Sequence, residues 1–313
     1  MTPFPALRIG TRGSRLALAQ TEGVRDRLIA AHPALAAPGA VEIVVIRTTG
    51  DAVQDRPLAE IGGKGLFTRE IDEAMLEGRI DIAVHSVKDV PTWLPDGIEM
   101  PCTLAREDPR DALICTKANS LAGLPAGAVI GTASLRRQAQ VLARRPDLVV
   151  RMLRGNVETR IRKIAEGAFD ATLLAIAGLK RIGLAGAATA VIEPEEMLPA
   201  VGQGAIGVTA RAGDDRATAL LAAIHDADTA TCVAAERALL AVLDGSCRTP
   251  IAALAIITES KQLLLRGLLA RPDGTRLVTA ERLGTSAEAV ALGEEAGRDL
   301  LARFGPGHAR HRG

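Results

Sequence analysis

The chain opens with a short apolar run and then changes to apolar residues at four-residue spacing. Residues 7–10 predict a buried strand, and the longer spacing predicts a helix over about 14–30. Ser14 is the candidate N-cap of this helix, because a serine hydroxyl accepts hydrogen bonds from the unpaired N–H groups at a helix start. The first segment is therefore expected to be a strand, a tight turn (TRGS) and a helix.

The same alternation continues to about residue 210. Short apolar runs predict further strands at 41–46, 80–84, 111–116, 129–132, 148–153 and 205–208. Amphipathic spacing predicts helices at about 66–77 and 134–144, and a further helix after residue 156. Strands that alternate with helices are typical of α/β lobes built on parallel sheets.

Two stretches rich in proline, glycine and charge interrupt the alternation. Residues 92–110 are predicted to be a hinge region, and residues 193–211 are predicted to be a second crossing between two lobes. The tripeptide Ile-Gly-Thr at 9–11 recurs at 130–132, each time followed by serine and arginine. We therefore expect a hinged, bilobal binder whose two lobes present similar turns.

The pattern changes again near residue 224. A helix around 232–243 is followed by two alternating segments, 251–257 and 262–269, that predict a hairpin in a smaller α+β domain. Three domains are thus expected. Their predicted boundaries are 1–104 with 205–222 for domain 1, 110–198 for domain 2 and 227–313 for domain 3.

Composition narrows the class of function. The 313 residues include 38 basic and 37 acidic side chains, which disfavours a nucleic-acid or membrane role driven by net charge. Aromatic residues make up 2% and tyrosine is absent, so base stacking is disfavoured too. The four cysteines show no zinc-site spacing, and no apolar run approaches the length of a membrane span. A cytoplasmic protein without a metal is expected.

Candidate chemistry is most concentrated in DIAVHSVKDVP, residues 81–91. An apolar run ends here in His85, Ser86, Lys88 and Asp89, and strand ends are where sites of α/β proteins usually lie. Asp89 is the one carboxylate beside otherwise cationic clusters, as the stabilisation of a developing positive charge requires. A turn or cap role is the alternative for Asp89. For His85, a structural role and proton transfer both remain open.

The cationic clusters follow predicted strands, at turns or first helical turns. They comprise Arg12 with Ser14, Lys64, Thr132 to Arg137, and Arg154 to Arg160. Helix starts favour anions, and guanidinium groups bind carboxylates through paired hydrogen bonds. We therefore expect these clusters to bind a polyanion. The plainer interpretation, a solvated helix face, suits Arg144, Arg145 and Arg162.

Cys247 in the turn GSCRTP is the candidate reactive thiol. Arg248 beside it favours the thiolate, which makes Cys247 a nucleophile or an attachment point, whereas a core position suits Cys102, Cys115 and Cys232. The glycine-rich IGGKGLF matches no phosphate-binding P-loop, and no G-x-G-x-x-G follows the first strand. Nucleotide binding is therefore not supported.

Seven ordered motifs resemble the porphobilinogen deaminase (hydroxymethylbilane synthase) family over essentially the whole chain. They are TRGS, GGKGLF, DIAVHSVKDVP, GTASLRRQAQ, LRGNVETR, AVGQGAIG and GSCRTPIA. The resemblance implies two lobes like those of type II periplasmic binding proteins, linked by a hinge, and a small third domain whose cysteine holds a dipyrromethane cofactor by a thioether. It also implies a monomeric cytoplasmic transferase of tetrapyrrole (haem) biosynthesis. Such an enzyme condenses four porphobilinogen molecules into hydroxymethylbilane and releases ammonia at each step.

The resemblance also implies roles for individual residues. Asp89 takes the catalytic role and Cys247 holds the cofactor, while Lys64 and Phe67 match a loop over the active site. The residues implied to bind cofactor and substrate carboxylates are Arg12, Ser14, Ser86, Lys88, Thr132, Ser134, Arg136, Arg137, Arg154, Arg160 and Gln203. This set suits a growing chain of pyrroles, because every pyrrole carries an acetate and a propionate. No metal is implied.

Two positions depart from the family pattern. Glu60 stands where many relatives carry a loop lysine, and DGSCRTP replaces the more familiar Gly-Gly-Cys-Gln around the attachment cysteine.

Two other classes of function compete with the enzyme. A non-enzymatic bilobal anion-binding protein leaves Cys247 and the third domain unexplained. A ligand-sensing regulator lacks a helix-turn-helix segment with a basic recognition helix.

Overall fold

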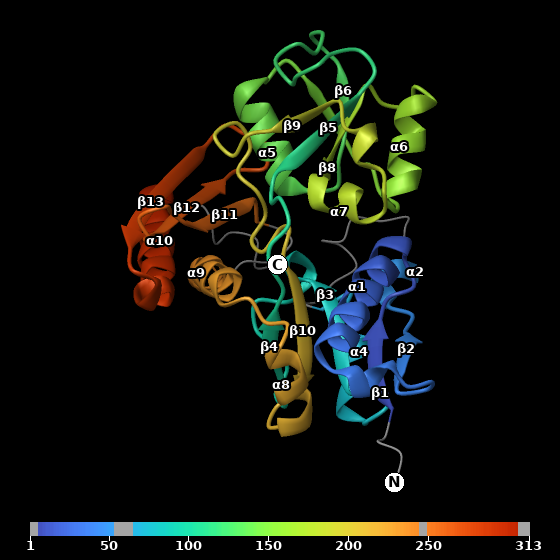
Figure 1. The fold of residues 1–313 in the computed structure, drawn as a ribbon. Helices are drawn as coiled ribbons and strands as arrows, with labels where there is room; N and C mark the ends of the chain where they lie inside the picture. Colours follow the sequence, from blue (N-terminus) through green and yellow to red (C-terminus); the bar gives the residue numbers. More distant parts are fainter. Residues whose placement is uncertain (1–5, 53–64, 244–248, 306–313) are drawn as a thin grey trace. The chain divides into compact units, whose positions relative to one another are not determined.

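The computed structural model describes residues 6–52, 65–243 and 249–305, which fall into two compact units (Figure 1). The first unit is described over 6–52, 65–107 and 205–230. The second is described over 108–204, 231–243 and 249–305. The chain leaves the first unit and returns to it, so segments far apart in the sequence share one core.

The first unit is built on a mixed sheet with the strand order β2-β1-β3-β10-β4. Its strands are β1 (Leu7–Thr11), β2 (Val41–Val45), β3 (Ile82–Ser86), β4 (Ile98–Thr103) and β10 (Ile206–Arg211). β1 pairs in parallel with β2 and β3, whereas β10 runs antiparallel to β3 and β4. The late strand β10 thus closes the sheet between two early strands.

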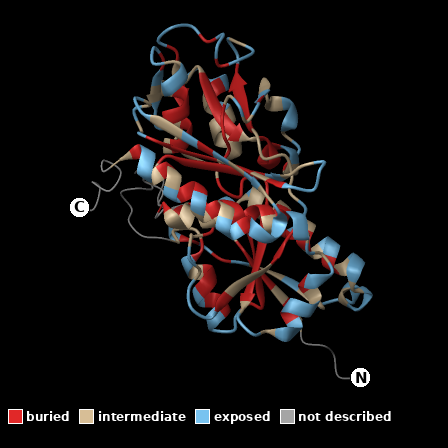
Figure 2. Ribbon diagram, turned by 90° about the vertical axis from the view of Figure 1, so that its left-hand side faces the viewer, coloured by how far each residue is buried: buried red, intermediate tan, exposed pale blue. Residues whose placement is uncertain are grey.

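Helices cover both faces of this sheet. α1 (Arg15–Ala31) and α8 (Asp215–Ala222) pack on one face, and α4 (Arg69–Leu76) packs on the other. The short helix α2 (Thr49–Ala52) follows β2. Burial of these apolar stripes against the strands drives the packing. Figure 2 shows the buried strands in red and the exposed helix faces in pale blue.

The second unit contains a sheet of the same design, ordered β7-β6-β8-β5-β9. Its strands are β5 (Asp111–Cys115), β6 (Val129–Gly131), β7 (Val149–Arg151), β8 (Ala171–Ala175) and β9 (Ala190–Ile192). β6 is parallel to β7 and β8, and β5 is antiparallel to β8 and β9. α5 (Leu135–Arg144) covers one face, and α6 (Val157–Ala165) and α7 (Ile176–Arg181) cover the other.

The second unit also holds an antiparallel sheet near the C-terminus. Its strands are β11 (Ile251–Ile257), β12 (Leu263–Ala270) and β13 (Leu277–Gly284), in that order. α9 (Ala227–Val242) and α10 (Ala289–Phe304) contribute to the core on one face. On the other face Leu254 and Leu268 pack against Ala139 of α5. This sheet therefore supports α5. Short 3-10 turns lie at Pro33–Ala36, Val87–Asp89, Ala185–Ala187 and Ser286–Glu288.

The repeated Ile-Gly-Thr segment occupies the same place in both α/β sheets. β1 and β6 each pair in parallel with two neighbours and lead into a helix capped by a serine. Ser14 Oγ accepts a hydrogen bond from the Ala17 N–H at 3.3 Å, and Ser134 Oγ accepts one from the Arg137 N–H at 3.4 Å. The predicted N-cap and the similarity of the two turns are confirmed.

The fold class is the expected one, two α/β lobes with a small α+β domain, but three details differ from the predictions. Residues 92–110 are not hinge throughout, because Ile98–Thr103 forms β4 and pairs with β10. Pro101 hid this strand, yet proline is tolerated there since β4 lies at the sheet edge. Both α/β sheets are mixed rather than parallel. β13 and α10 had not been predicted.

The predicted domain boundaries remain a hypothesis. None of the helices in the described ranges is long and apolar enough to cross a membrane.

Candidate active site

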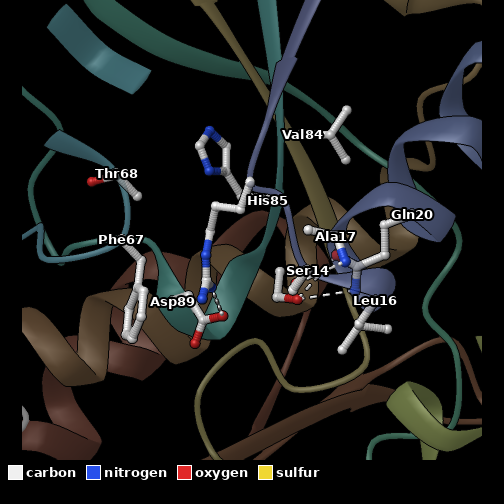
Figure 3. A pocket seen from close by; sticks show the side chains of 11 residues that line it. Ser14, Leu16, Ala17, Gln20, Phe67, Thr68, Val84, His85 and Asp89 are labelled. Atoms are coloured by element: carbon white, nitrogen blue, oxygen red, sulfur yellow. Dashed lines mark hydrogen bonds and ion pairs between the residues drawn. The ribbon is translucent and has the colours of Figure 1, made fainter. Parts of the chain in front are cut away.

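A pocket in the first unit opens beside the end of β3 and the start of α1 (Figure 3). Its described lining residues are Arg12, Ser14, Leu16, Ala17, Gln20, Phe67, Thr68, Val84, His85, Ser86 and Asp89. β1 and β3 are parallel neighbours, so the segments that follow them meet at one sheet edge. Five of the predicted site residues come together here: Arg12, Ser14, Phe67, Ser86 and Asp89.

Asp89 reaches the pocket from the 3-10 turn Val87–Asp89 that directly follows β3. Its carboxylate oxygen Oδ2 lies 3.7 Å from Nη1 of Arg12, and its side chain is 35% exposed. The Arg12 guanidinium carbon also lies 4.1 Å from the centroid of the Phe67 ring. A ring face attracts a cation, so Phe67 and Asp89 together orient Arg12. The pocket thus combines an accessible carboxylate with an oriented guanidinium group.

Ser86 and Gln20 form a polar contact in the pocket wall. Gln20 Nε2 donates to Ser86 Oγ at 3.0 Å, and Gln20 is nearly fully buried although it belongs to a polar residue type. Gln20 was not among the site residues predicted from the sequence. The available signal was its place on the core-facing side of α1, between Leu16 and Val24, where an amide is unusual without a partner.

His85 is a buried residue whose ring also lines the pocket. Its Nε2 lies 3.0 Å from Thr209 Oγ1 on β10, the strand paired with β3. Burial, together with the nearby charge of Arg12, lowers the pKa of His85 to about 4. A neutral ring with a fixed partner favours the structural role over proton transfer near pH 7.

A second cluster of predicted residues lies in the second unit around Asp111, the first residue of β5. Arg136 Nη2 lies 2.8 Å from Asp111 Oδ2, and Arg137 Nη2 donates to Oδ1 at 2.7 Å. Gln203 Nε2 donates to the same Oδ1 at 2.9 Å. Both arginines are only 6% exposed and Asp111 is 0% exposed. Three predicted binding residues thus converge on a buried carboxylate.

Asp111 was not identified from the sequence as a site residue. The available signal was an acid at the head of the apolar run 112–115, where an ionised carboxylate needs partners. Burial alone would raise the pKa of Asp111, but the charges of Arg136 and Arg137 outweigh it and hold the pKa below its usual range. The buried cluster therefore carries two positive charges against one negative charge.

The other predicted binding residues of the second unit lie at helix starts. The Thr132 hydroxyl accepts a hydrogen bond from the Ser134 N–H at 3.1 Å, just before α5. Arg154 precedes α6, and Arg160 on α6 donates Nε–H to the Gly155 carbonyl at 2.8 Å. In the first unit, Lys88 lies in the same turn as Asp89 and is exposed. Helix starts and exposed cations are suited to anions, and the binding role of these residues stays a prediction.

Four positions discussed from the sequence lie outside the described residues. They are Glu60, Lys64, Cys247 and Arg248. Groups of histidine, cysteine, aspartate and glutamate that could hold a metal ion are not found among the described residues.

Family comparisons cover almost the entire chain. Residues 7–219 match the model "Porphobilinogen deaminase, dipyromethane cofactor binding domain", and residues 230–302 match "Porphobilinogen deaminase, C-terminal domain". The chloroplastic porphobilinogen deaminase of Oryza sativa subsp. japonica is 57% identical over 303 residues, which are 96% of this chain and 85% of the relative. The Paracoccus denitrificans porphobilinogen deaminase is 56% identical over 301 residues, 96% of this chain and 95% of the relative.

The solved structures that align with this chain are more distant in sequence. A periplasmic substrate-binding protein of an ABC transporter from Coxiella burnetii aligns with a TM-score of 0.44 and 15% identity, over 74% of this chain and 96% of its own. A putative methionine-binding lipoprotein from Bacillus subtilis aligns with a TM-score of 0.42 and 11% identity, over 71% and 91%. The family models and the curated relatives carry the assignment: this chain belongs to the porphobilinogen deaminase family, whose members are transferases.

Proposed function

We propose that this chain is a hydroxymethylbilane synthase, which joins four porphobilinogen molecules head to tail and releases ammonia at each step of tetrapyrrole biosynthesis. The observation that carries the proposal is the pocket in which the Asp89 carboxylate faces Arg12, within a chain of this family. The Asp89 side chain is 35% exposed and its contact with Arg12 is long, at 3.7 Å, so the carboxylate is available to a substrate.

Asp89 is the catalytic residue in this proposal. When the C–N bond of the aminomethyl group breaks, the ammonium group leaves as ammonia with the bonding electron pair. The methylene group and the pyrrole ring then share one positive charge, part of it on the ring nitrogen. A fixed carboxylate that accepts a hydrogen bond from the ring N–H stabilises this charge as it develops. The charge disappears when a second pyrrole carbon forms the new C–C bond and loses its proton.

Arg12 changes partner in the proposed cycle. At 3.7 Å its contact with Asp89 is longer than a charge-assisted hydrogen bond, which is about 2.7–2.9 Å. An incoming substrate carboxylate offers Arg12 a better partner in hydrogen-bonding distance, while the Phe67 ring keeps the guanidinium in place. Asp89 then faces the pyrrole N–H instead of Arg12. Substrate binding and catalytic readiness are coupled through this exchange.

Residues of the second unit suit the dipyrromethane cofactor, which carries carboxylates on both rings. Its fit rests on the donors: Arg136 and Arg137 share one carboxylate, and their buried Nε atoms have no hydrogen-bond acceptor among the described residues. Arg136, Arg137, Thr132, Ser134, Arg154, Arg160 and Gln203 would hold its carboxylates and those of the pyrroles added to it, with Cys247 as the covalent anchor. When bound, the cofactor supplies the pyrrole carbon from which the chain of four units grows.

The remaining assignments are part of the same proposal. Ser14, Ser86 and Lys88 bind substrate carboxylates in the first unit, and Lys64 and Phe67 belong to a loop over the active site.

The chain forms three domains with the boundaries predicted above, and it acts as a cytoplasmic monomer. In support of a reducing compartment, Cys102 and Cys115 are buried thiols outside any disulfide. Size-exclusion chromatography with light scattering measures the oligomeric state directly.

Intact mass spectrometry tests the proposed function first. The wild type and Cys247→Ser are incubated with porphobilinogen, and both are treated with an acidic aldehyde reagent that colours free pyrroles. The wild type should gain the mass of two linked porphobilinogen-derived units and should colour, whereas Cys247→Ser should do neither. Ammonia and hydroxymethylbilane should then accumulate in a ratio of four to one with the loaded wild type.

The same experiment separates the competing classes of function. A non-enzymatic anion-binding protein would bind porphobilinogen without a gain of covalent mass and without ammonia release. That outcome would replace the enzyme by a binding protein with this fold. An equal mass gain in Cys247→Ser would keep the enzyme but move the anchor to another residue.

A further inference from the structure

Two consecutive residues of α5 converge on one carboxylate in the second unit. Neighbouring positions on an α-helix point about 100° apart, so adjacent side chains diverge unless a partner draws them together. Arg136 nevertheless reaches Asp111 Oδ2, and Arg137 reaches Oδ1. Arg136 is held further by a hydrogen bond from Nη1 to the Leu198 carbonyl at 2.7 Å. The two cations would repel each other without the carboxylate between them.

Asp111 is itself held from several sides. It begins β5, where it pairs with Ala175 of β8 and Ile192 of β9. Gln203 Nε2 donates to both Asp111 Oδ1 and the Pro109 carbonyl, at 2.9 and 2.7 Å. The carboxylate therefore has a fixed position and a fixed orientation.

The turn that carries Gln203 is held in place by Glu236. The N–H of Gly202 donates to Glu236 Oε2 at 2.7 Å, and the N–H of Ala255 donates to Glu236 Oε1 at 2.8 Å. Glu236 lies on α9 and is 0% exposed. A hydrogen-bond chain thus runs from α9 through Gly202 and Gln203 to Asp111.

We infer that Asp111 is a positioning residue, which fixes the guanidinium groups of Arg136 and Arg137 so that the pair receives one carboxylate of a pyrrole ligand. The inference rests on the proposed function and assigns a role to a residue that does not touch the ligand. The net charge of the cluster agrees with the binding of a ligand carboxylate, because two guanidinium groups and one carboxylate leave a single positive charge. The buried Nε–H groups of both arginines also find no acceptor among the described residues.

A competing explanation is that Asp111 only offsets charge. The two explanations predict opposite effects of Asp111→Asn, which keeps the shape but removes the negative charge. If Asp111 only offset charge, the variant would leave two full cations and would bind anionic pyrroles more tightly. If Asp111 positions the arginines, the variant releases them and anionic pyrroles bind more weakly.

The test compares Asp111→Asn with Asp108→Asn in the loaded enzyme. Asp108 is a matched control, since it pairs with Arg110 at 2.8 Å in the same unit, outside the predicted site. Asp111→Asn should raise KM for porphobilinogen about tenfold or more while kcat changes less than about threefold. Asp108→Asn should leave both constants near the wild-type values. An unchanged or lower KM in Asp111→Asn would overturn the inference.

A second readout does not depend on turnover. Nuclear magnetic resonance detects arginine Nε–H signals, which are sharp and exchange slowly when the side chain is held and buried. Arg136 and Arg137 should give such signals in wild type and in Asp108→Asn, and should lose them in Asp111→Asn. If the proposed function is wrong, wild type releases no ammonia, but the arginine signals still report on the two side chains. Retained signals in Asp111→Asn would contradict the positioning role in either case.

A milder variant covers the case in which Asp111→Asn does not fold. Gln203→Met removes the amide donor to Asp111 Oδ1 but keeps both arginines and the carboxylate. Because Gln203 is itself one of the proposed binding residues, the readout for this variant is the arginine Nε–H signals, which should exchange faster than in wild type. A folded Gln203→Met protein with wild-type arginine signals would count against the inference.

Discussion

The Arg12 guanidinium lies 3.7 Å from the Asp89 carboxylate, which is close enough for attraction and too far for a strong hydrogen bond. Arg12 comes from the turn after β1, and Asp89 comes from the turn after β3. The parallel pairing of the two strands brings these turns together. This contact is the basis of the first prediction.

Asp89→Asn should retain the fold and lose turnover. The side chain is 35% exposed, so the variant should unfold within a few degrees of wild type. Without the negative charge, the developing cation loses its stabilisation, and kcat should fall by about a hundredfold to a thousandfold or more. Ammonia release measures the rate. Asp96→Asn, at an exposed site of the same unit, is the control and should stay active; wild-type turnover in Asp89→Asn would refute the catalytic assignment.

Asp72 on α4 should destabilise the protein at neutral pH. Burial raises the pKa of Asp72 to about 6, above its ordinary value of 3.8. The unfolded chain therefore releases the proton at lower pH than the folded protein, and stability present below about pH 4 is lost as pH rises to about 6. Asp72→Asn should gain up to about 3 kcal/mol at pH 7 and little at pH 4.

Urea unfolding at both pH values measures the effect of Asp72→Asn. Glu73→Gln serves as the control, because Glu73 neighbours Asp72 on the same helix but is exposed. A less stable Asp72→Asn protein at pH 7 would show that the carboxylate is needed rather than costly.

His85 should make the protein sensitive to acid. Burial lowers the pKa of His85 to about 4, below its ordinary value of 6.5. As pH falls, His85 binds a proton in the unfolded chain but stays neutral in the folded protein. The free energy of unfolding therefore falls between about pH 6.5 and pH 4. The loss amounts to about 3 kcal/mol. His85→Gln should lose correspondingly less stability over this range.

Thr209→Val provides the comparison for His85→Gln. It removes the hydrogen-bond partner at 3.0 Å but keeps the titrating ring. Its unfolding free energy should be lower at every pH and should still fall in acid. Equal acid slopes in wild type and His85→Gln would exclude His85 as the source of the effect.

Gly274 should be required for the packing of the C-terminal sheet on α5. It lies in the turn between β12 and β13 with φ of +73°, and an added Cβ would lie 2.5 Å from the Ala143 nitrogen of α5. Gly274→Ala should cost about 1–3 kcal/mol through backbone strain and overpacking. Gly127→Ala separates the two causes, because Gly127 has φ of +75° with nothing within 4 Å of its Cβ. Thermal unfolding that is equal in both variants would rule out the contact with α5.

Much of the fold followed from local patterns. The strand and helix that contain Leu7 and Ser14 could be predicted because apolar spacing and capping chemistry act within a few residues. β4 could not, because only its place at a sheet edge makes Pro101 acceptable in a strand. The antiparallel insertion of β10 beside β3 was also hidden, since pairing between residues more than a hundred positions apart leaves no local signal.

The sequence by itself determined the family, the alternation of strands and helices, and the choice of Asp89, Arg12 and the arginines of α5 as candidates, because motifs and periodicity are local properties. Only the tertiary structure decided which groups meet. It placed Arg12 against Asp89 and Phe67, buried His85 against Thr209, and brought Arg136 and Arg137 onto Asp111. Such contacts depend on strand pairing and helix packing, which set distances between residues that the chain itself holds far apart.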